Sequence, residues 1–163
     1  IIMNTFFIIC LLFSIFIIVF EPCDNFIKSD SGNYYSAKDK NTANLLDMLR
    51  NISFDLVKEL NEIDSKTLKY SLRFTSFVEL RHGNNNVMAT NTDKGREIAI
   101  RVYDRYGEPF KASFILHSLF HELAHTLVKP TGHGPVWESK DDELQKIAPK
   151  YVDFLIKNTF LTE

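Results

Sequence analysis

The spacing of hydrophobic positions along the chain separates predicted helices from predicted strands. Between residues 42 and 63, apolar side chains recur every three or four positions, as on the buried face of an amphipathic helix. Asn41 or Thr42 is the expected cap, because either side chain can bond the free N–H groups of a first helical turn. In residues 72–80 and 98–102, apolar and polar side chains alternate instead, which predicts two half-buried strands.

The helical spacing returns twice in the second half of the chain. Residues 111–128 are predicted to form a helix, because Pro109 precedes the apolar run and Pro130 follows it without interrupting it. Residues 137–158 are predicted to form a closing helix, kinked at Pro149. The apolar stripe expected on the first of these helices consists of Leu116, Leu119, Phe120, Leu123 and Leu127. Helix, strands, helix and closing helix, in that order, predict an α+β domain with a mixed sheet.

The first 40 residues differ in composition from the rest. Residues 1–20 carry no charged side chain, and a run of that length can cross a hydrocarbon layer about 30 Å thick. No Lys or Arg precedes the run and no small-residue cleavage site is clear before Pro22, so we expect a membrane anchor. A cleaved signal segment, which would make the protein secreted, is the alternative. Residues 21–40 are rich in Asn, Ser, Asp and Lys and are expected to form a polar tether.

Composition favours one globular domain, at residues 41–163, after these two segments. The chain is 45% hydrophobic and 25% charged, as globular proteins are. Its 19 Lys and Arg nearly balance 21 Asp and Glu and form no basic tract, so composition gives no indication of nucleic-acid binding. Both cysteines, Cys10 and Cys23, precede the domain, which excludes a disulfide within it.

A short motif within the helix predicted at 111–128 indicates chemistry. His121-Glu122-Leu123-Ala124-His125 places two imidazoles one turn apart on one face of the helix, with a carboxylate beside the first. This is the H-E-x-x-H pattern of zinc-dependent peptidases, in which the two His bind the metal and the Glu acts as general base. The apolar stripe lies on a different face, so we expect the imidazoles to project away from the core.

A catalytic zinc ion normally has three protein ligands and a water, so a third ligand is expected. His133 is the first choice, because Thr131-Gly132 lets the chain turn back after the helix. Glu143 is the main alternative, since one large class of these enzymes takes its third ligand from a Glu on a later helix. Glu138 is a further acidic candidate.

His117, one turn before His121, is not expected to be a ligand. It lies about 12 Å along the helix axis from His125, too far for all three side chains to reach one ion. We expect His117 near the ligands, at the rim of the cleft or simply at the surface.

With the motif, the segment Gly132-His133-Gly134-Pro135-Val136-Trp137 resembles the Wss1-like (WLM) and SprT-like metallopeptidases. Those families share a minimal zincin fold, with a third His followed closely by an aromatic residue. The resemblance covers residues 98–151. It implies a zincin-like domain, one zinc ion (Zn²⁺) bound by His121, His125 and His133, and catalysis by Glu122. Trp137 matches the aromatic position, for which packing is the expected role.

Peptide-bond hydrolysis is the function that these residues favour. Zinc would lower the pKa of a bound water toward ~7, and Glu122 would take the proton and pass it to the departing amine. The expected partners are a protein or peptide substrate and, through residues 1–20, a membrane. An edge strand could pair with extended substrate, and residues 89–91 and 98–102 are both candidates. The alternative is a membrane-tethered binding module with structural zinc, which has no need of the Glu122 carboxylate.

Overall fold

The computed structural model describes residues 25–63, 72, 75–81, 83 and 86–163, with residues 61–63 described by their backbone alone. The predicted anchor at residues 1–20 and the first part of the predicted tether lie outside the described residues. Among the helices in the described part of the chain, none has both the length and the apolar character that crossing a bilayer requires.

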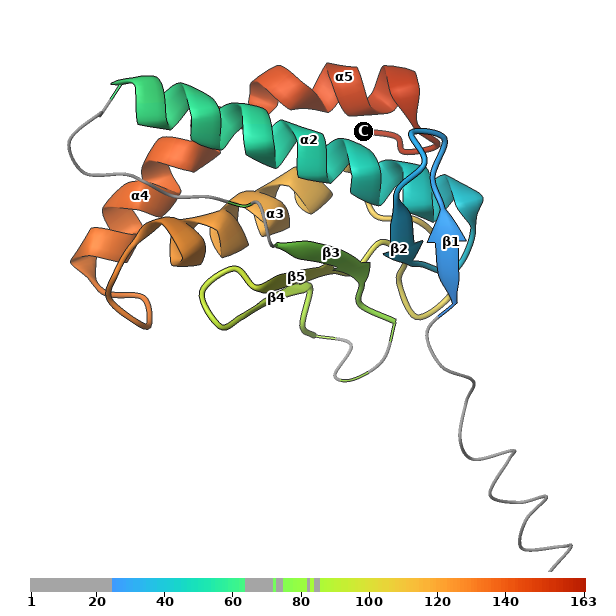
Figure 1. Ribbon diagram of the computed structural model, residues 1–163, viewed down its shortest axis with the longest axis horizontal. Helices are drawn as coiled ribbons and strands as arrows, with labels where there is room; N and C mark the ends of the chain where they lie inside the picture. Colours follow the sequence, from blue (N-terminus) through green and yellow to red (C-terminus); the bar gives the residue numbers. More distant parts are fainter. Residues whose placement is uncertain (1–24, 64–71, 73–74, 82, 84–85) are drawn as a thin grey trace, which may run out of the picture.

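A three-stranded mixed sheet lies beneath the helices of the domain (Figure 1). Its strands, in the order β3-β5-β4, are β3 (Ser76–Glu79), β5 (Glu97–Ile100) and β4 (Ala89–Thr92). β3 runs parallel to β5, whereas β4 and β5 form an antiparallel hairpin. The predicted α+β class with a mixed sheet is therefore confirmed. Of the two candidate edge strands, β4 lies at the edge and β5 at the centre.

Two helices cover one face of this sheet and enclose the core, as Figure 1 shows. These are α2 (Lys40–Ile63) and α3 (Ala112–Leu127), which confirm the helices predicted at 42–63 and 111–128. All five residues of the predicted apolar stripe on α3 are at most 2% exposed. Each buried Leu or Phe contributes about 1.5–3 kcal/mol relative to an exposed one, so the stripe holds α3 in place and leaves its other face for chemistry.

The first turn of α2 is capped by a residue two to three positions earlier than predicted. The Asp39 carboxylate accepts hydrogen bonds from the backbone N–H (2.8 Å) and the hydroxyl (2.9 Å) of Thr42. Asp39 is thus the cap, and the prediction of Asn41 or Thr42 was wrong. An ionised Asp suits this position because it also interacts favourably with the partial positive charge at a helix N-terminus.

The described part of the predicted tether is folded. β1 (Phe26–Lys28) and β2 (Tyr34–Ser36) pair as an antiparallel hairpin that packs against α2 and β3. Tyr35 is 4% exposed and its hydroxyl donates a 2.6 Å hydrogen bond to Oδ1 of Asp47 on α2. The segment predicted as a polar tether therefore contains a hairpin in its described part, held by a buried tyrosine rather than by an apolar run.

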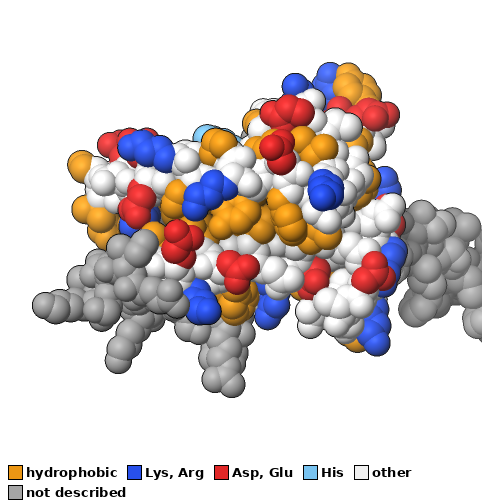
Figure 2. Space-filling view, turned by 90° about the horizontal axis from the view of Figure 1, so that it is seen from above, with side chains coloured by type: hydrophobic (Ala, Val, Ile, Leu, Met, Phe, Trp, Pro, Cys, Tyr) orange, Lys and Arg blue, Asp and Glu red, His pale blue; other side chains and the backbone are white. Residues whose placement is uncertain are grey.

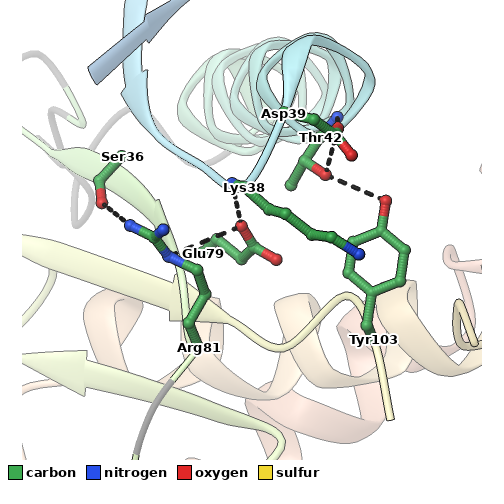
Figure 3. Close-up of polar contacts among 7 residues, drawn as sticks. All are labelled: Ser36, Lys38, Asp39, Thr42, Glu79, Arg81 and Tyr103. Carbon is green, nitrogen blue, oxygen red and sulfur yellow. Dashed lines mark hydrogen bonds and ion pairs between the residues drawn. The ribbon is translucent and has the colours of Figure 1, made fainter. Parts of the chain in front are cut away.

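Glu79, at the end of β3, connects the hairpin to the sheet (Figure 3). Its carboxylate accepts a hydrogen bond from the backbone N–H of Lys38 and lies 3.9 Å from Nε of Arg81. Arg81 also donates to the Ser36 hydroxyl at 3.4 Å. Burial raises the pKa of Glu79, against the opposing effect of these donors. The contacts join segments more than 40 positions apart in the chain.

Two helices close the C-terminal side of the domain where one kinked helix was predicted. They are α4 (Pro135–Gln145) and α5 (Pro149–Asn158). Each begins with a proline in its first turn, where the missing N–H costs nothing because that group has no partner inside the helix. The helix predicted at 137–158 is therefore interrupted at residues 146–148 rather than kinked. Figure 2 views the α2 and α5 face, where apolar side chains gather among scattered charges of both signs.

Candidate metal centre and active site

The exposed side of α3 and the loop after it bring three imidazoles together. The rings of His121 and His125, one helical turn apart, have centroids 5.3 Å apart. After Leu127 the backbone becomes extended at Val128, and Gly132 adopts a φ of +81°, a left-handed conformation that glycine tolerates best. The chain turns back there, and Nε2 of His133 lies 3.1 Å from Nε2 of His125.

The three histidines form a donor set that fits a zinc ion. One ring nitrogen from each of His121, His125 and His133 lies within 4.8 Å of the other two. Two nitrogens bound to a tetrahedral zinc at about 2.0–2.1 Å would be about 3.3 Å apart. Small rotations of the rings would bring the three nitrogens to this spacing. Burial lowers the pKa of both His121 and His125, which favours the neutral rings that bind metals. Imidazole donors at this spacing suit zinc better than Mg²⁺ or Ca²⁺, which prefer oxygen.

Glu122 is the buried carboxyl group beside this triad. It is 7% exposed, and burial raises its pKa to about 7. A carboxyl group with a pKa near neutrality can both accept and return a proton at physiological pH. A divalent cation held by the neighbouring imidazoles would favour the charged form and lower this pKa again.

A cleft of about 380 Å³ opens beside Glu122 and His121. It lies between α3 and the segment that enters the edge strand β4. Its apolar wall consists of Val87, Met88, Ala89 and Phe114, and its polar rim consists of Asn86, His117 and Ser118. The cleft can therefore receive a largely apolar side chain next to the candidate base.

Gln145, at the end of α4, fixes the orientation of His117. The Gln145 amide nitrogen donates to Oδ1 of Asp141 and to the carbonyl of His117, both at 3.0 Å. Because both partners can only accept, the amide oxygen of Gln145 is left to accept from Nδ1–H of His117 at 2.9 Å. His117 therefore lies outside the triad, as predicted, and lines the cleft with its Nδ1 engaged.

Asp141 lies beside the triad at a place that the sequence did not predict. It lies in the middle of α4, on the side that packs against α3. Its Oδ2 lies 4.0 Å from Nδ1 of His121, so the carboxylate faces this nitrogen and leaves Nε2 for a metal. The sequence signal that could have identified Asp141 is helical spacing. Trp137, Asp141 and Gln145 follow one another at intervals of four and therefore share one face of α4.

The indole of Trp137 packs against all three imidazoles of the triad. Its ring centroid lies 4.7 Å from that of His121, 5.0 Å from that of His125 and 4.4 Å from that of His133. The side chain is buried, and its Nε1 has no hydrogen-bond partner among the described residues. The indole therefore restricts the rotation of all three imidazoles at once.

The acidic alternatives for a third ligand lie elsewhere. Glu143 is exposed and pairs with Lys140 at 2.5 Å. Glu138 is exposed in the first turn of α4. Among the described residues, the group able to hold a metal ion contains neither glutamate.

Comparison with known proteins shows a likeness of fold. No family model and no curated protein sequence matches the chain. A crystal structure of a mutant of Wss1 from Saccharomyces cerevisiae matches with a TM-score of 0.52 and 19% identity, over 74% of this chain and 90% of that one. A second crystal structure of Wss1 gives a TM-score of 0.48 and 21% identity, over 68% and 84% of the two chains. The chain thus has a Wss1-like fold, as its sequence motifs predicted.

Proposed function

We propose that this protein is a zinc-dependent endopeptidase. The observation that carries the proposal is the convergence of His121, His125 and His133 beside the buried carboxyl group of Glu122. The Wss1-like fold supports it, because the motif-bearing segment resembles the Wss1-like metallopeptidases. A purely structural zinc site would have no need of a buried carboxyl group and an adjoining cleft.

In the proposed mechanism His121, His125 and His133 would hold a zinc ion, which when bound would supply Lewis-acid chemistry to a water molecule and to the scissile carbonyl. Glu122 accepts the proton of the attacking water and delivers it to the departing amine. Trp137 and Asp141 keep the imidazoles in their binding orientations. His117 is held at the cleft by Gln145, where it can contact the bound peptide.

The edge strand β4 supplies the second half of the proposed substrate site. Its outer edge has no neighbouring strand in the described sheet, so its backbone groups can pair with an extended peptide. The apolar wall formed by Val87, Met88 and Phe114 would then receive one substrate side chain. Binding through backbone groups together with one apolar subsite favours unfolded or extended protein segments as substrates.

The test is the Glu122→Gln variant, assayed on an unfolded protein substrate. The amide keeps the size of the side chain but cannot take a proton, so turnover should fall by about 10²- to 10⁴-fold. One zinc per chain should remain, measured by elemental analysis. Glu138→Gln, an exposed change of the same kind on α4, serves as control and should keep the wild-type rate.

Two results would count against the proposal. Unchanged turnover in Glu122→Gln would remove Glu122 as base. If the wild type binds zinc tightly but cleaves nothing, the protein is instead a zinc-stabilised binding module.

We also propose, from the apolar run at residues 1–20, that the domain is attached to a membrane. Alkaline extraction of membranes containing the full chain tests this, and release into the soluble fraction would contradict it.

A further inference from the structure

The turn between β4 and β5 reaches the end of α3. Nζ of Lys94 lies 2.6 Å from the carbonyl oxygen of Pro130, 3.3 Å from that of Val128 and 3.4 Å from that of His125. An ammonium group has three N–H donors and no acceptor, so these three carbonyls match its full capacity. One side chain thus contacts the last turn of the helix and the loop that follows it.

The carbonyl of His125 belongs to the last turn of α3, and those of Val128 and Pro130 follow directly after it. The last four carbonyls of an α-helix have no partner within the helix, and that end carries partial negative charge. In α3 the residue His125 is the only basic one in the last turn, and its ring faces the other imidazoles. The positive charge is therefore supplied by Lys94, from a different element.

The backbone of the β4–β5 turn is left-handed at consecutive residues, which lets it lie close to α3. Lys94 has a φ of +57°, a left-handed conformation that a long side chain rarely adopts, and Gly95 follows with a φ of +94°. A methyl group added at Gly95 would lie 2.5 Å from Cγ2 of Thr126. Only glycine therefore allows the turn to lie this close to α3.

Asn91 of β4 completes the connection. Its amide nitrogen donates to the carbonyl of Glu122 and to the hydroxyl of Thr126, both at 2.7 Å. Its amide oxygen accepts from the backbone N–H of Gly95, also at 2.7 Å. The proposed substrate-binding strand is thereby bonded to the residue proposed as base.

We propose that Asn91, Lys94 and Gly95 form a clamp that sets the position of the third metal ligand, His133. This inference rests on the proposed zinc site. Lys94 fixes the chain at Val128 and Pro130, and Pro130 is three residues before His133. The loop from Val128 to His133 would otherwise sample many conformations, and each zinc-binding event would bear the entropic cost of ordering it. Lys94 is thus a positioning residue for His133.

The experiment uses the Lys94→Met variant of the full chain, which keeps most of the side-chain stem but removes the ammonium. Zinc affinity, measured by competition with a chromophoric chelator, should fall about 10- to 100-fold, as for other residues that orient metal ligands. Lys94→Arg should recover part of the affinity, since it restores donors at this place. Lys129→Met removes an exposed positive charge from the same loop and should leave the affinity unchanged.

The visible spectrum of the Co²⁺-substituted protein provides a second readout. We expect a weaker and altered d–d absorption in Lys94→Met, because its third imidazole would be less well held. If Lys94→Met does not fold, Lys94→Gln, which keeps a neutral donor on a shorter stem, undergoes the same measurements.

The outcomes separate this inference from the proposed function. Wild-type affinity and spectrum in the Lys94 variant, with tight zinc binding by the wild type, would overturn the clamp alone. A lower melting temperature of the metal-free variant with unchanged zinc affinity would also overturn it, because Lys94 would then only cap the helix. If the wild type itself binds no zinc, the proposed function fails and the clamp with it.

Discussion

Asp141 and Gln145 show how two side chains on α4 determine what the imidazoles on α3 can do. Both polar atoms of the Gln145 amide have hydrogen-bond partners, and its oxygen can only accept. A neutral His117 ring must therefore carry its hydrogen on Nδ1. Asp141 faces Nδ1 of His121 and is itself held by Gln145. A metal-bound His usually has a partner of this kind on its other nitrogen, because it fixes the ring and raises its basicity.

Replacing Asp141 by Asn should weaken zinc binding without removing a ligand. The amide keeps the shape of the side chain but loses the charge that faces His121, so we expect an affinity about 10- to 100-fold lower. Chelator competition measures it. Asp142→Asn, an exposed change of equal charge on the next residue, is the matched control. Equal affinities in the two variants would show that Asp141 does not orient His121.

The buried carboxyl group of Glu122 should make the stability of the metal-free protein depend on pH. Its pKa is raised from 4.5 to about 7 in the folded chain, so the folded state holds a proton that the unfolded state releases. The free energy of unfolding should therefore fall as the pH rises from about 4.5 to 7, by up to about 3 kcal/mol, and stay lowered above that range.

Glu122→Gln removes this dependence. The metal-free variant should melt above the wild type by a margin that grows up to about pH 7 and then stays constant. Thermal unfolding at several pH values, with chelator present, measures the difference. A constant margin at all pH values would mean that the carboxyl group does not titrate in this range.

Among the elements, α3 is where the sequence was most informative. Its apolar stripe has helical spacing, prolines lie on both sides of it, and the two His of the motif occupy a face that the stripe leaves free. The turn at Gly132 could be predicted from residue type alone, and with it the return of the chain toward His133. Each of these signals is local, which is why α3 could be located to within one residue at each end.

Other features were harder to predict because their signals depend on distant partners. β4 could be named only as one of two candidate edge strands, because its sequence Ala-Thr-Asn-Thr shows no apolar alternation and none of its side chains is fully buried. Lys94 has no local feature that distinguishes it from the other lysines, since its role arises from three carbonyls more than 30 positions away. The hairpin of β1 and β2 could not be predicted because its contacts, such as the hydrogen bond between Ser36 and Arg81 in Figure 3, join it to residues far away in the chain.

The cleft between β4 and α3 should select for apolar side chains in the substrate. Met88 lies in its apolar wall, so Met88→Lys should shift cleavage from sites with an apolar residue toward sites with an acidic one. Mass spectrometry of a digested peptide library gives both profiles. Phe154→Lys, at an exposed position on α5 away from the cleft, should leave the profile unchanged. Identical profiles for wild type and Met88→Lys would place the subsite elsewhere.

At the scale of the whole molecule, the candidate site lies where three parts of the fold meet. α3 brings the first two imidazoles and Glu122, the β4–β5 hairpin holds the end of α3, and α4 contributes Asp141 and Trp137. The presence of helices packed on a mixed sheet could be predicted from the order of the elements. Which residues of neighbouring elements lie opposite one another could not, because that follows from side-chain packing between the elements.

The position of Trp137 has a practical consequence, because the chain has only one tryptophan. That indole lies against all three imidazoles, so its light emission reports on this one place in the molecule. Occupancy of the centre by a quenching ion such as Co²⁺ can therefore be followed optically in the unlabelled protein. The chain carries its own probe of metal loading.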